Sequence, residues 1–188
     1  MYPCRAMPRL ADLAHALARF TPADPTEAGH LARMLELARG AGDPCARDHF
    51  VPGHFTASAF VLDPDGGSLL LIFHEKFRRW LQPGGHVEPD DVDLVAAALR
   101  EVHEETGLTE VDVVGEGWFD LDIHDIPARK GDPDHQHFDV RILLRARTTA
   151  FAAGSDALAA RWVPLSEVSK VETDESVMRA VRKLQARR

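Results

Sequence analysis

Hydrophobic positions near the start of the chain recur with the spacing of an α-helix in two segments. The first stripe contains Leu10, Leu13, Ala14 and Leu17, and the second contains Leu31, Met34, Leu35 and Ala38. Each set falls on one side of a helix. Asp24, Pro25 and Glu27 form a typical helix start, and Gly40 supplies a stop signal. We therefore expect a helical extension over residues 1–48 that acts as a lid, a packing element or a dimer contact.

From residue 55 onward the pattern changes to short apolar and alternating runs, which indicate strands. Residues 55–62 and 68–74 flank the turn sequence 63–67 and predict a β-hairpin with a five-residue connection. Further strands are expected at 80–82, 111–117, 118–124, 138–147 and 160–163, and a closing helix at 176–185. Strands on both sides of a central helix predict a domain over residues 49–188 in which a mixed sheet lies between helices.

The central helix separates its apolar and acidic positions onto different faces. Its apolar arc contains Val92, Val95, Ala98, Leu99, Val102 and Thr106. Asp90 or Asp91 offers an N-cap, and Gly107 offers a left-handed C-terminal cap. These signals predict one helix of about four turns.

The acidic face holds Glu101, Glu104 and Glu105, which are related by i, i+3 and i+4. Like charges this close repel unless a cation lies among them, and Arg100 can orient Glu104 four residues later. Oxygen ligands in this arrangement suit a hard divalent ion, Mg²⁺ or Mn²⁺. A solvated charged surface is the alternative. The preceding 83–85 loop, Pro-Gly-Gly, favours the ion because glycine carbonyls can approach it closely.

At these residues the chain resembles the Nudix hydrolase family. The family signature is Gly, five residues, Glu, seven residues, Arg-Glu, an apolar residue, any residue, Glu-Glu, any residue, Gly and an apolar residue. The residues that match by type are Gly85, Arg100, Glu101, Val102, Glu104, Glu105, Gly107 and Leu108. The segment from about Gly53 to Leu165 also resembles the family's domain. The resemblance implies an α/β (α+β) fold, an α/β/α sandwich with a mixed β-sheet.

The chain departs from the signature in the stretch before the helix. The spacing from Gly85 to Arg100 is one residue longer, and Val92 stands where the family places a Glu. We interpret this as a one-residue expansion of the loop, with Asp91 in the role of the missing Glu. A shorter acid can support the loop and the helix start by hydrogen bonding and capping.

The resemblance implies Mg²⁺-dependent hydrolysis, with Mn²⁺ as the alternative, of a pyrophosphate bond in a nucleoside diphosphate linked to another group. In that reading Glu101, Glu104, Glu105 and the Gly84 carbonyl hold the ions, and Arg100 orients Glu104. Glu104 or Glu105 takes a proton from the attacking water. Two other functions stay open. The altered spacing favours a catalytically weak nucleotide-binding or sensor module, and a prenyl diphosphate isomerase would need a reactive cysteine near the cleft.

Family members often add an acid from a loop far from the helix, as a metal ligand or a base. Asp156 is the candidate by position, with Glu116 and Glu175 as alternatives. The basic group Lys76, Arg78 and Arg79 precedes the glycine loop and is a candidate for holding the non-reacting phosphate. An exposed loop is the other interpretation of that group.

Polar residues alternate along two predicted strands, so each set shares a face. His135, His137, Asp139 and Arg141 form either a substrate-binding wall or the wet face of a strand. A zinc site there is less favoured because no third soft ligand is evident. For Asp120, Asp122 and His124 we expect a solvated face.

Composition limits the classes of function. The chain has 188 residues, 45% hydrophobic and 28% charged, as in an ordinary globular protein. Its net charge of −8 argues against non-specific nucleic-acid binding. Cys4 and Cys45 are too few for a disulfide framework, and the longest aliphatic run, 69–73, is far short of a membrane span. We expect a cytoplasmic protein with a nucleotide-type small-molecule substrate and neither a nucleic-acid nor a membrane partner; a homodimer stays open.

Overall fold

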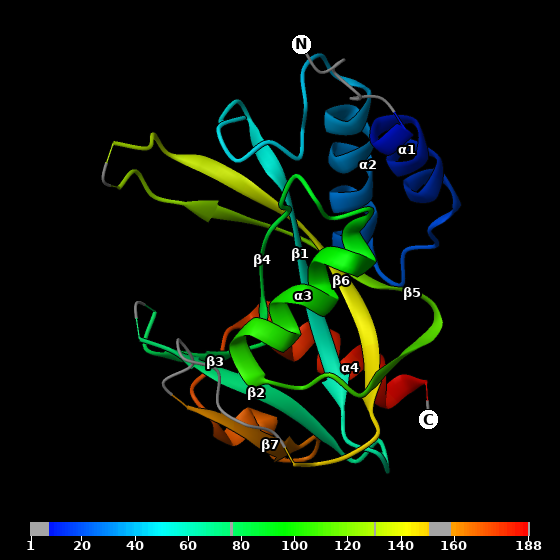
Figure 1. Ribbon diagram of the computed structural model, residues 1–188, viewed down its shortest axis with the longest axis vertical. Helices are drawn as coiled ribbons and strands as arrows, with labels where there is room; N and C mark the ends of the chain where they lie inside the picture. The colour runs from blue at the N-terminus through cyan, green and yellow to red at the C-terminus, as the bar shows by residue number, and fades with distance from the viewer. Residues whose placement is uncertain (1–7, 76, 130, 151–158, 188) are drawn as a thin grey trace.

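The computed structural model describes residues 8–75, 77–129, 131–150 and 159–187 (Figure 1). In chain order the elements are α1 (Pro8–Arg19), α2 (Pro25–Arg39), β1 (Gly53–Leu62), β2 (Ser68–His74), β3 (Arg79–Leu81), β4 (Gly84–His86), α3 (Leu94–Thr106), β5 (Val111–Ile126), β6 (His135–Ala146), β7 (Ala160–Pro164), a 3-10 turn (Val168–Lys170) and α4 (Glu175–Ala186).

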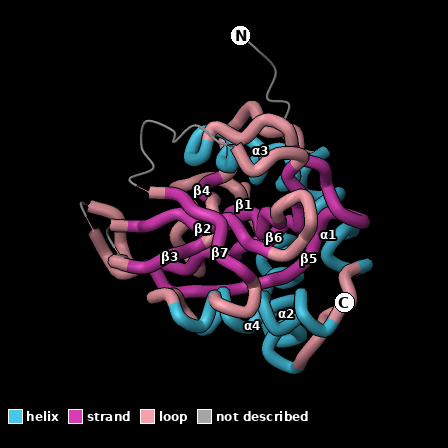
Figure 2. The backbone as a smooth tube through the Cα atoms, turned by 90° about the horizontal axis from the view of Figure 1, so that it is seen from below, coloured by secondary structure: helices cyan, strands magenta, loops and turns pink. Residues whose placement is uncertain are grey.

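The strands form a single mixed sheet within these described ranges (Figure 2). Its seven strands follow the order β3-β2-β1-β6-β5, with β4 paired to β1 and β7 paired to β2. The pairing of β1 with β6 is parallel, whereas the pairs β1–β2, β1–β4, β2–β3, β2–β7 and β5–β6 are antiparallel. The predicted hairpin of residues 55–62 and 68–74 is therefore confirmed.

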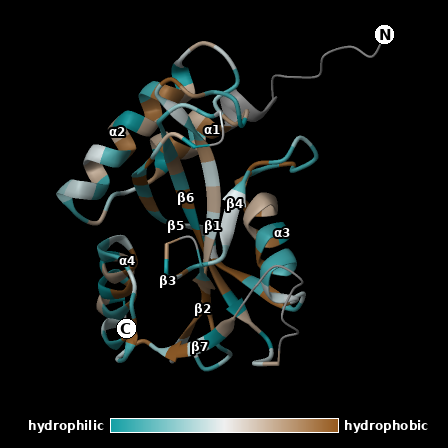
Figure 3. Ribbon diagram, turned by 90° about the vertical axis from the view of Figure 1, so that its left-hand side faces the viewer, coloured by the Kyte–Doolittle hydropathy of each residue, from teal (hydrophilic) through white to brown (hydrophobic). Residues whose placement is uncertain are grey.

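Helices cover both faces of this sheet (Figures 1 and 3). On one face, Phe55 and Ala57 of β1 pack in a core cluster with Val102 of α3. On the other, Phe60 of β1 packs in a second cluster with Val181 of α4. Alternate side chains of one strand thus serve two cores, which explains why β1 is buried along its whole length. The predicted α/β/α sandwich is confirmed.

The N-terminal helices join the first of these cores. Leu17 of α1 and Met34 of α2 are fully buried in the same cluster as Phe55. At the start of α2 the Asp24 side chain accepts a hydrogen bond from the Glu27 backbone, as the local sequence predicts. These contacts give the helices a packing role. The division into an extension and a domain at residue 49 stays a prediction.

Some element bounds differ from those expected. β5 is one long strand where two were predicted, because the pair with β6 absorbs a register shift between Val113 and Trp118. Gly115 and Gly117 adopt positive φ there, at 64° and 91°. β6 begins at His135, three residues before the predicted start at 138. The short strand β4 was not predicted.

Candidate functional site

α3 presents a buried face and an acidic face, but it begins later than expected. The N-cap is Asp93, whose side chain accepts a hydrogen bond from Ala96 N, so the prediction of Asp90 or Asp91 as the cap is wrong. Val92 precedes the helix and is 76% exposed, which removes it from the predicted apolar arc. Gly107 has φ of 70° and ends the helix, as predicted. The buried residues of the helix are Leu94, Ala97, Ala98, Val102 and Thr106.

The predicted carboxylates converge beside the glycine loop. Arg100 Nη1 donates to Glu101 Oε1 at 2.9 Å and to Glu104 Oε2 at 3.0 Å. Glu105 Oε2 accepts a hydrogen bond from Gly84 N at 2.9 Å. The Glu101 side chain is 14% exposed, whereas that of Glu104 is 55% exposed. Solvent exposure therefore differs among the three carboxylates: those next to the loop are partly buried, and Glu104 is exposed at the surface.

The Glu101 carboxylate occupies the space that a side chain at position 85 would fill. A Cβ built on Gly85 would lie 2.5 Å from Glu101 Oε1 and 2.7 Å from Glu101 Cδ. A Cβ on Gly84 would instead lie 2.3 Å from Ser58 Cβ, across the β1–β4 pairing. The lack of a side chain thus makes room for a carboxylate at Gly85 and for the neighbouring strand β1 at Gly84.

Asp91 stabilises this loop through Arg100. It is 6% exposed, and Glu88 N donates to its Oδ2 at 2.8 Å. Arg100 donates to both of its oxygens and also to the carbonyl of His86 at 2.8 Å. Asp91 therefore supports the loop and Arg100 by hydrogen bonding, whereas the capping part of its expected role falls to Asp93.

The electrostatics of the cluster favour a bound cation. Burial, together with the charges of Glu101 and Glu104, raises the pKa of Glu105 to about 7, against the opposing effect of the Gly84 N–H. Burial also raises the pKa of Glu101, although Arg100 opposes the shift. Crowded carboxylate oxygens with elevated pKa values are a donor set that a hard divalent ion stabilises. The residues present thus fit Mg²⁺ or Mn²⁺.

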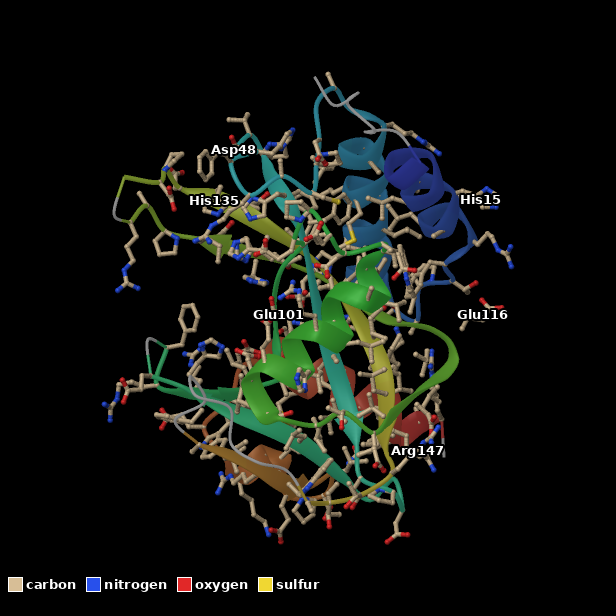
Figure 4. The ribbon with its side chains drawn as sticks, in the orientation of Figure 1. His15, Asp48, Glu101, Glu116, His135 and Arg147 are labelled. Carbon is tan, nitrogen blue, oxygen red and sulfur yellow. The ribbon has the colours of Figure 1, made fainter. Side chains whose placement is uncertain are left out.

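The predicted substrate-binding residues that the structure describes line a pocket of about 900 Å³. Gly84 and Gly85 line this pocket, but Glu101, Glu104 and Glu105 do not. Figure 4 shows His135 near the hairpin of β5 and β6, apart from Glu101 on α3. Of the residues predicted to bind substrate, His135, His137, Asp139, Arg141 and Arg79 line the pocket.

Asp139 and Arg141 are buried in the floor of the pocket and bonded to their surroundings. Asp139 accepts hydrogen bonds from Thr56, Ser58 and Arg141. Arg141 also pairs with Asp120 at 3.2 Å and with Asp122 at 3.1 Å. Because these groups are already engaged, a role in shaping the pocket fits them better than direct contact with substrate.

The prediction that Asp120 and Asp122 of β5 lie on a solvated face is wrong. Asp120 is fully buried and Asp122 is 5% exposed. Arg179 of α4 donates to both, at 2.9 Å and 3.2 Å, and α4 covers the strand. Only His124 of that set is exposed, with 45% of its side chain accessible.

Three polar residues of β1 also line the pocket and were not predicted as site residues: His54, Thr56 and Ser58. All three are buried, and they alternate with Phe55 and Ala57. This alternation could have identified them from the sequence, because polar residues that share one face of a predicted buried strand indicate that this face lines a polar site.

Lys76 and Asp156 lie outside the described residues. Glu116 is exposed on β5 and points away from α3 (Figure 4). The Glu175 side chain is 80% exposed and pairs with Arg182. Neither alternative acid lines the pocket beside Gly84.

Comparison with known proteins identifies the family. The sequence model of the NUDIX domain matches residues 52–184. The chain belongs to the NUDIX family. It is 40% identical over 91 residues to a "Probable DHNTP pyrophosphohydrolase" of Lactococcus lactis subsp. cremoris (strain MG1363). That alignment covers 47% of the chain and 52% of the relative, so the chain spans about half the length of this relative.

Solved structures share the NUDIX fold. A NUDIX hydrolase from Clostridium perfringens matches with a TM-score of 0.51 at 22% identity, over 72% of this chain and 98% of that one. The M. Smegmatis Nudix hydrolase RenU matches with a TM-score of 0.53 at 18% identity, over 71% and 84%. A C. elegans Ap4A hydrolase matches with a TM-score of 0.51 at 18% identity, over 70% and 95%. Within the described part of the chain, no helix combines the length and apolar character needed to cross a membrane.

Proposed function

We propose that this NUDIX protein is a metal-dependent pyrophosphohydrolase that acts on a nucleoside diphosphate linked to another group. The observation that supports this most directly is that Glu101 and Glu105 contact the Gly84–Gly85 loop, while Arg100 links Glu104 to Glu101. A purely structural surface has no need to crowd three acids against a glycine loop at the cost of repulsion. The L. lactis relative, named a probable pyrophosphohydrolase, supports the same class of reaction.

The carboxylates of Glu101, Glu104 and Glu105, together with the Gly84 carbonyl, would hold Mg²⁺. Bound Mg²⁺ supplies charge neutralisation at phosphate oxygens and makes nearby water more acidic. Arg100 positions Glu101 and Glu104 through the hydrogen bonds of its Nη1, so it is a positioning residue. Glu104 or Glu105 accepts the proton of the attacking water. The more open position of Glu104 gives it the easier access to solvent.

The pocket of about 900 Å³ has the size and polarity for the nucleoside part of the substrate. Gly84 and Gly85 line the pocket, and Glu101 and Glu105 contact these two glycines, so the substrate diphosphate would lie beside this loop. Arg79 is exposed at the rim and offers a charged group for a phosphate.

The proposal is tested by an Mg²⁺-dependent phosphate-release screen. The compounds are nucleotide sugars, dinucleoside polyphosphates including Ap4A, ADP-ribose, nucleotide cofactors, oxidised nucleoside triphosphates and DHNTP. With the best substrate, Glu104→Gln and Glu105→Gln should each reduce kcat by at least about 100-fold. His103→Gln, an exposed change on the same helix, should keep activity within about two-fold. Turnover by both glutamine variants within a few-fold of wild type would refute the assigned roles.

A further inference from the structure

A cluster of histidines lies in the wall of the pocket, away from the α3 carboxylates. His54 of β1 is in register with His137 of β6 through the parallel pairing of these strands, and His135 lies two residues earlier on the same face. One ring nitrogen from each of the three residues lies within 4.8 Å of the others. Their ring centroids are 4.9–5.3 Å apart. The fold thus supplies the third nitrogen ligand that the sequence of β6 lacked.

Backbone carbonyls orient two of these rings. His54 Nδ1 lies 3.3 Å from the carbonyl of His49, and His135 Nδ1 lies 2.9 Å from that of Pro133. Because a carbonyl only accepts, each Nδ1 must be the protonated nitrogen, and the lone pair is on Nε2. A metal-binding histidine commonly has this arrangement, with the second nitrogen bonded to a carbonyl that fixes the tautomer.

Two ring nitrogens of this cluster have no hydrogen-bond partner among the described residues. Nε2 of His54 and Nε2 of His137 are buried and make no hydrogen bond to any described residue. A buried polar atom without a partner costs about 1–3 kcal/mol. Two such atoms in one cluster indicate that a ligand satisfies both.

The charge state of the rings favours a cation over a phosphate. Burial lowers the pKa of His137 to about 2, and it also lowers the pKa of His54. These rings are therefore neutral near pH 7, which suits metal coordination and gives a phosphate no positive charge.

We propose that His54, His135 and His137 form a second metal site, for a borderline divalent transition ion such as Zn²⁺. Three nitrogens bound to one tetrahedral zinc at about 2.1 Å lie about 3.4 Å apart. The ligand atoms of the three residues lie within 4.8 Å of one another, so metal binding would draw them closer together. Imidazole nitrogens favour zinc and the α3 oxygens favour magnesium, so the two sites select different ions.

The position of the site gives it access to the pocket. Three protein ligands leave a fourth coordination position open, as in sites that exchange water for a ligand. The three histidines line the pocket, so that position is open to a pocket ligand. The ring of His86 is centred 5.1 Å from those of His54 and His137, beside the site.

Zinc titration calorimetry on the full chain, in excess Mg²⁺ to saturate the α3 oxygens, tests the proposal. We expect one equivalent of Zn²⁺ that Mg²⁺ does not displace. Loss of an outer partner alone weakens metal binding by about 10–100-fold, so His137→Gln and His135→Gln should exceed that range. His103→Gln and Glu105→Gln should bind Zn²⁺ as wild type does, which separates this site from α3. Equal zinc affinity in all four variants would overturn the proposal.

Histidine ring NMR on the wild-type protein supplies a readout that no folding defect can affect. Added Zn²⁺ should shift the Nε2 signals of His54, His135 and His137 and leave His103 unchanged. Shifts confined to other histidines, or no zinc binding at all, would also overturn the proposal. Both measurements report binding and not turnover, so their outcome is independent of the pyrophosphohydrolase assignment.

Discussion

Arg100 donates to both carboxylate oxygens of Asp91, through Nε at 3.2 Å and through Nη2 at 3.0 Å. Through its other contacts the same guanidinium also bonds to Glu101, Glu104 and the carbonyl of His86. This one side chain therefore links the expanded loop to the acidic face of α3. These contacts hold the loop, which is one residue longer than the family signature, against the acidic face of the helix.

The first prediction concerns this pair. Asp91→Asn removes the negative charge that pairs with Arg100 and places an amide beside the guanidinium. The free energy of unfolding should therefore fall by about 1–3 kcal/mol. The Mg²⁺ concentration for half-maximal activity should rise, because Arg100 no longer fixes Glu101. Denaturant titration and the Mg²⁺ dependence of turnover are the measurements.

Asp93→Asn is the matched control, the same chemical change two residues later. Asn caps a helix about as well as Asp, so stability and Mg²⁺ dependence should stay close to wild type. Equal losses in the two variants would contradict a specific role for Asp91.

The second prediction separates the two glycines of the loop. In Gly85→Ala the new methyl group meets the end of a flexible side chain, Glu101, which can move aside. We expect the melting temperature to change little while activity falls by at least about 10-fold, since a displaced ligand disrupts positioning. In Gly84→Ala the methyl meets Cα and Cβ of Ser58 and the carbonyl of Ala57. That variant should lose about 1–3 kcal/mol of stability or more.

Thermal denaturation and kinetic assays of both glycine variants measure the two predicted effects, on melting temperature and on activity. A Gly85→Ala protein with full activity would show that Glu101 does not need its observed position.

The third prediction concerns the pH dependence of metal-free protein. The pKa of Glu105 is about 7 in the folded state, above the ordinary value of 4.5, so the folded state binds this proton more tightly than the unfolded state does. Stability from this group is therefore present at low pH and is lost as pH rises from about 4.5 to about 7. Glu105→Gln, which still accepts from Gly84 N, should escape this loss. With chelator present, the variant should gain on the order of 2 kcal/mol relative to wild type across the window.

Parallel denaturant titrations of wild type and Glu105→Gln between pH 4.5 and 8 measure that difference. Excess Mg²⁺ should reduce it, because the ion stabilises the ionised carboxylate of the wild type. A difference that stays flat with pH would mean that Glu105 is not perturbed in the folded chain.

The fourth prediction compares a buried with an exposed arginine. Arg141→Met leaves Asp139, Asp120 and Asp122 with less compensation in a buried setting, so we expect a loss of about 3–5 kcal/mol. Arg147→Met removes the exposed ion pair between Arg147 and Asp112, whose side chains are 63% and 53% accessible, and should change stability far less than Arg141→Met does. Urea unfolding of both proteins tests the contrast, and similar losses would argue against a stabilising role for the buried network.

Local sequence was enough for the features that depend on neighbours along the chain. The spacing of Glu101, Glu104 and Glu105 brings them together on any helix, so their convergence needed no tertiary information. The hairpin of β1 and β2 could also be predicted from the sequence, since its turn lies within one short segment. The cap at Asp93 was missed by two or three residues, because several acids in this stretch offer the same capping chemistry.

Tertiary structure decided what lies opposite each strand. The alternation of Asp120 and Asp122 fits an exposed face, and only the placement of α4 with Arg179 above them makes that face buried and charged. In the same way, the sequence does not show which residue lies next to His54 of β1. Only the parallel pairing of β1 with β6 brings His54 opposite His137. Period-two patterns tell which side chains share a face, but not which surface covers it, since pairing depends on residues far apart in the chain.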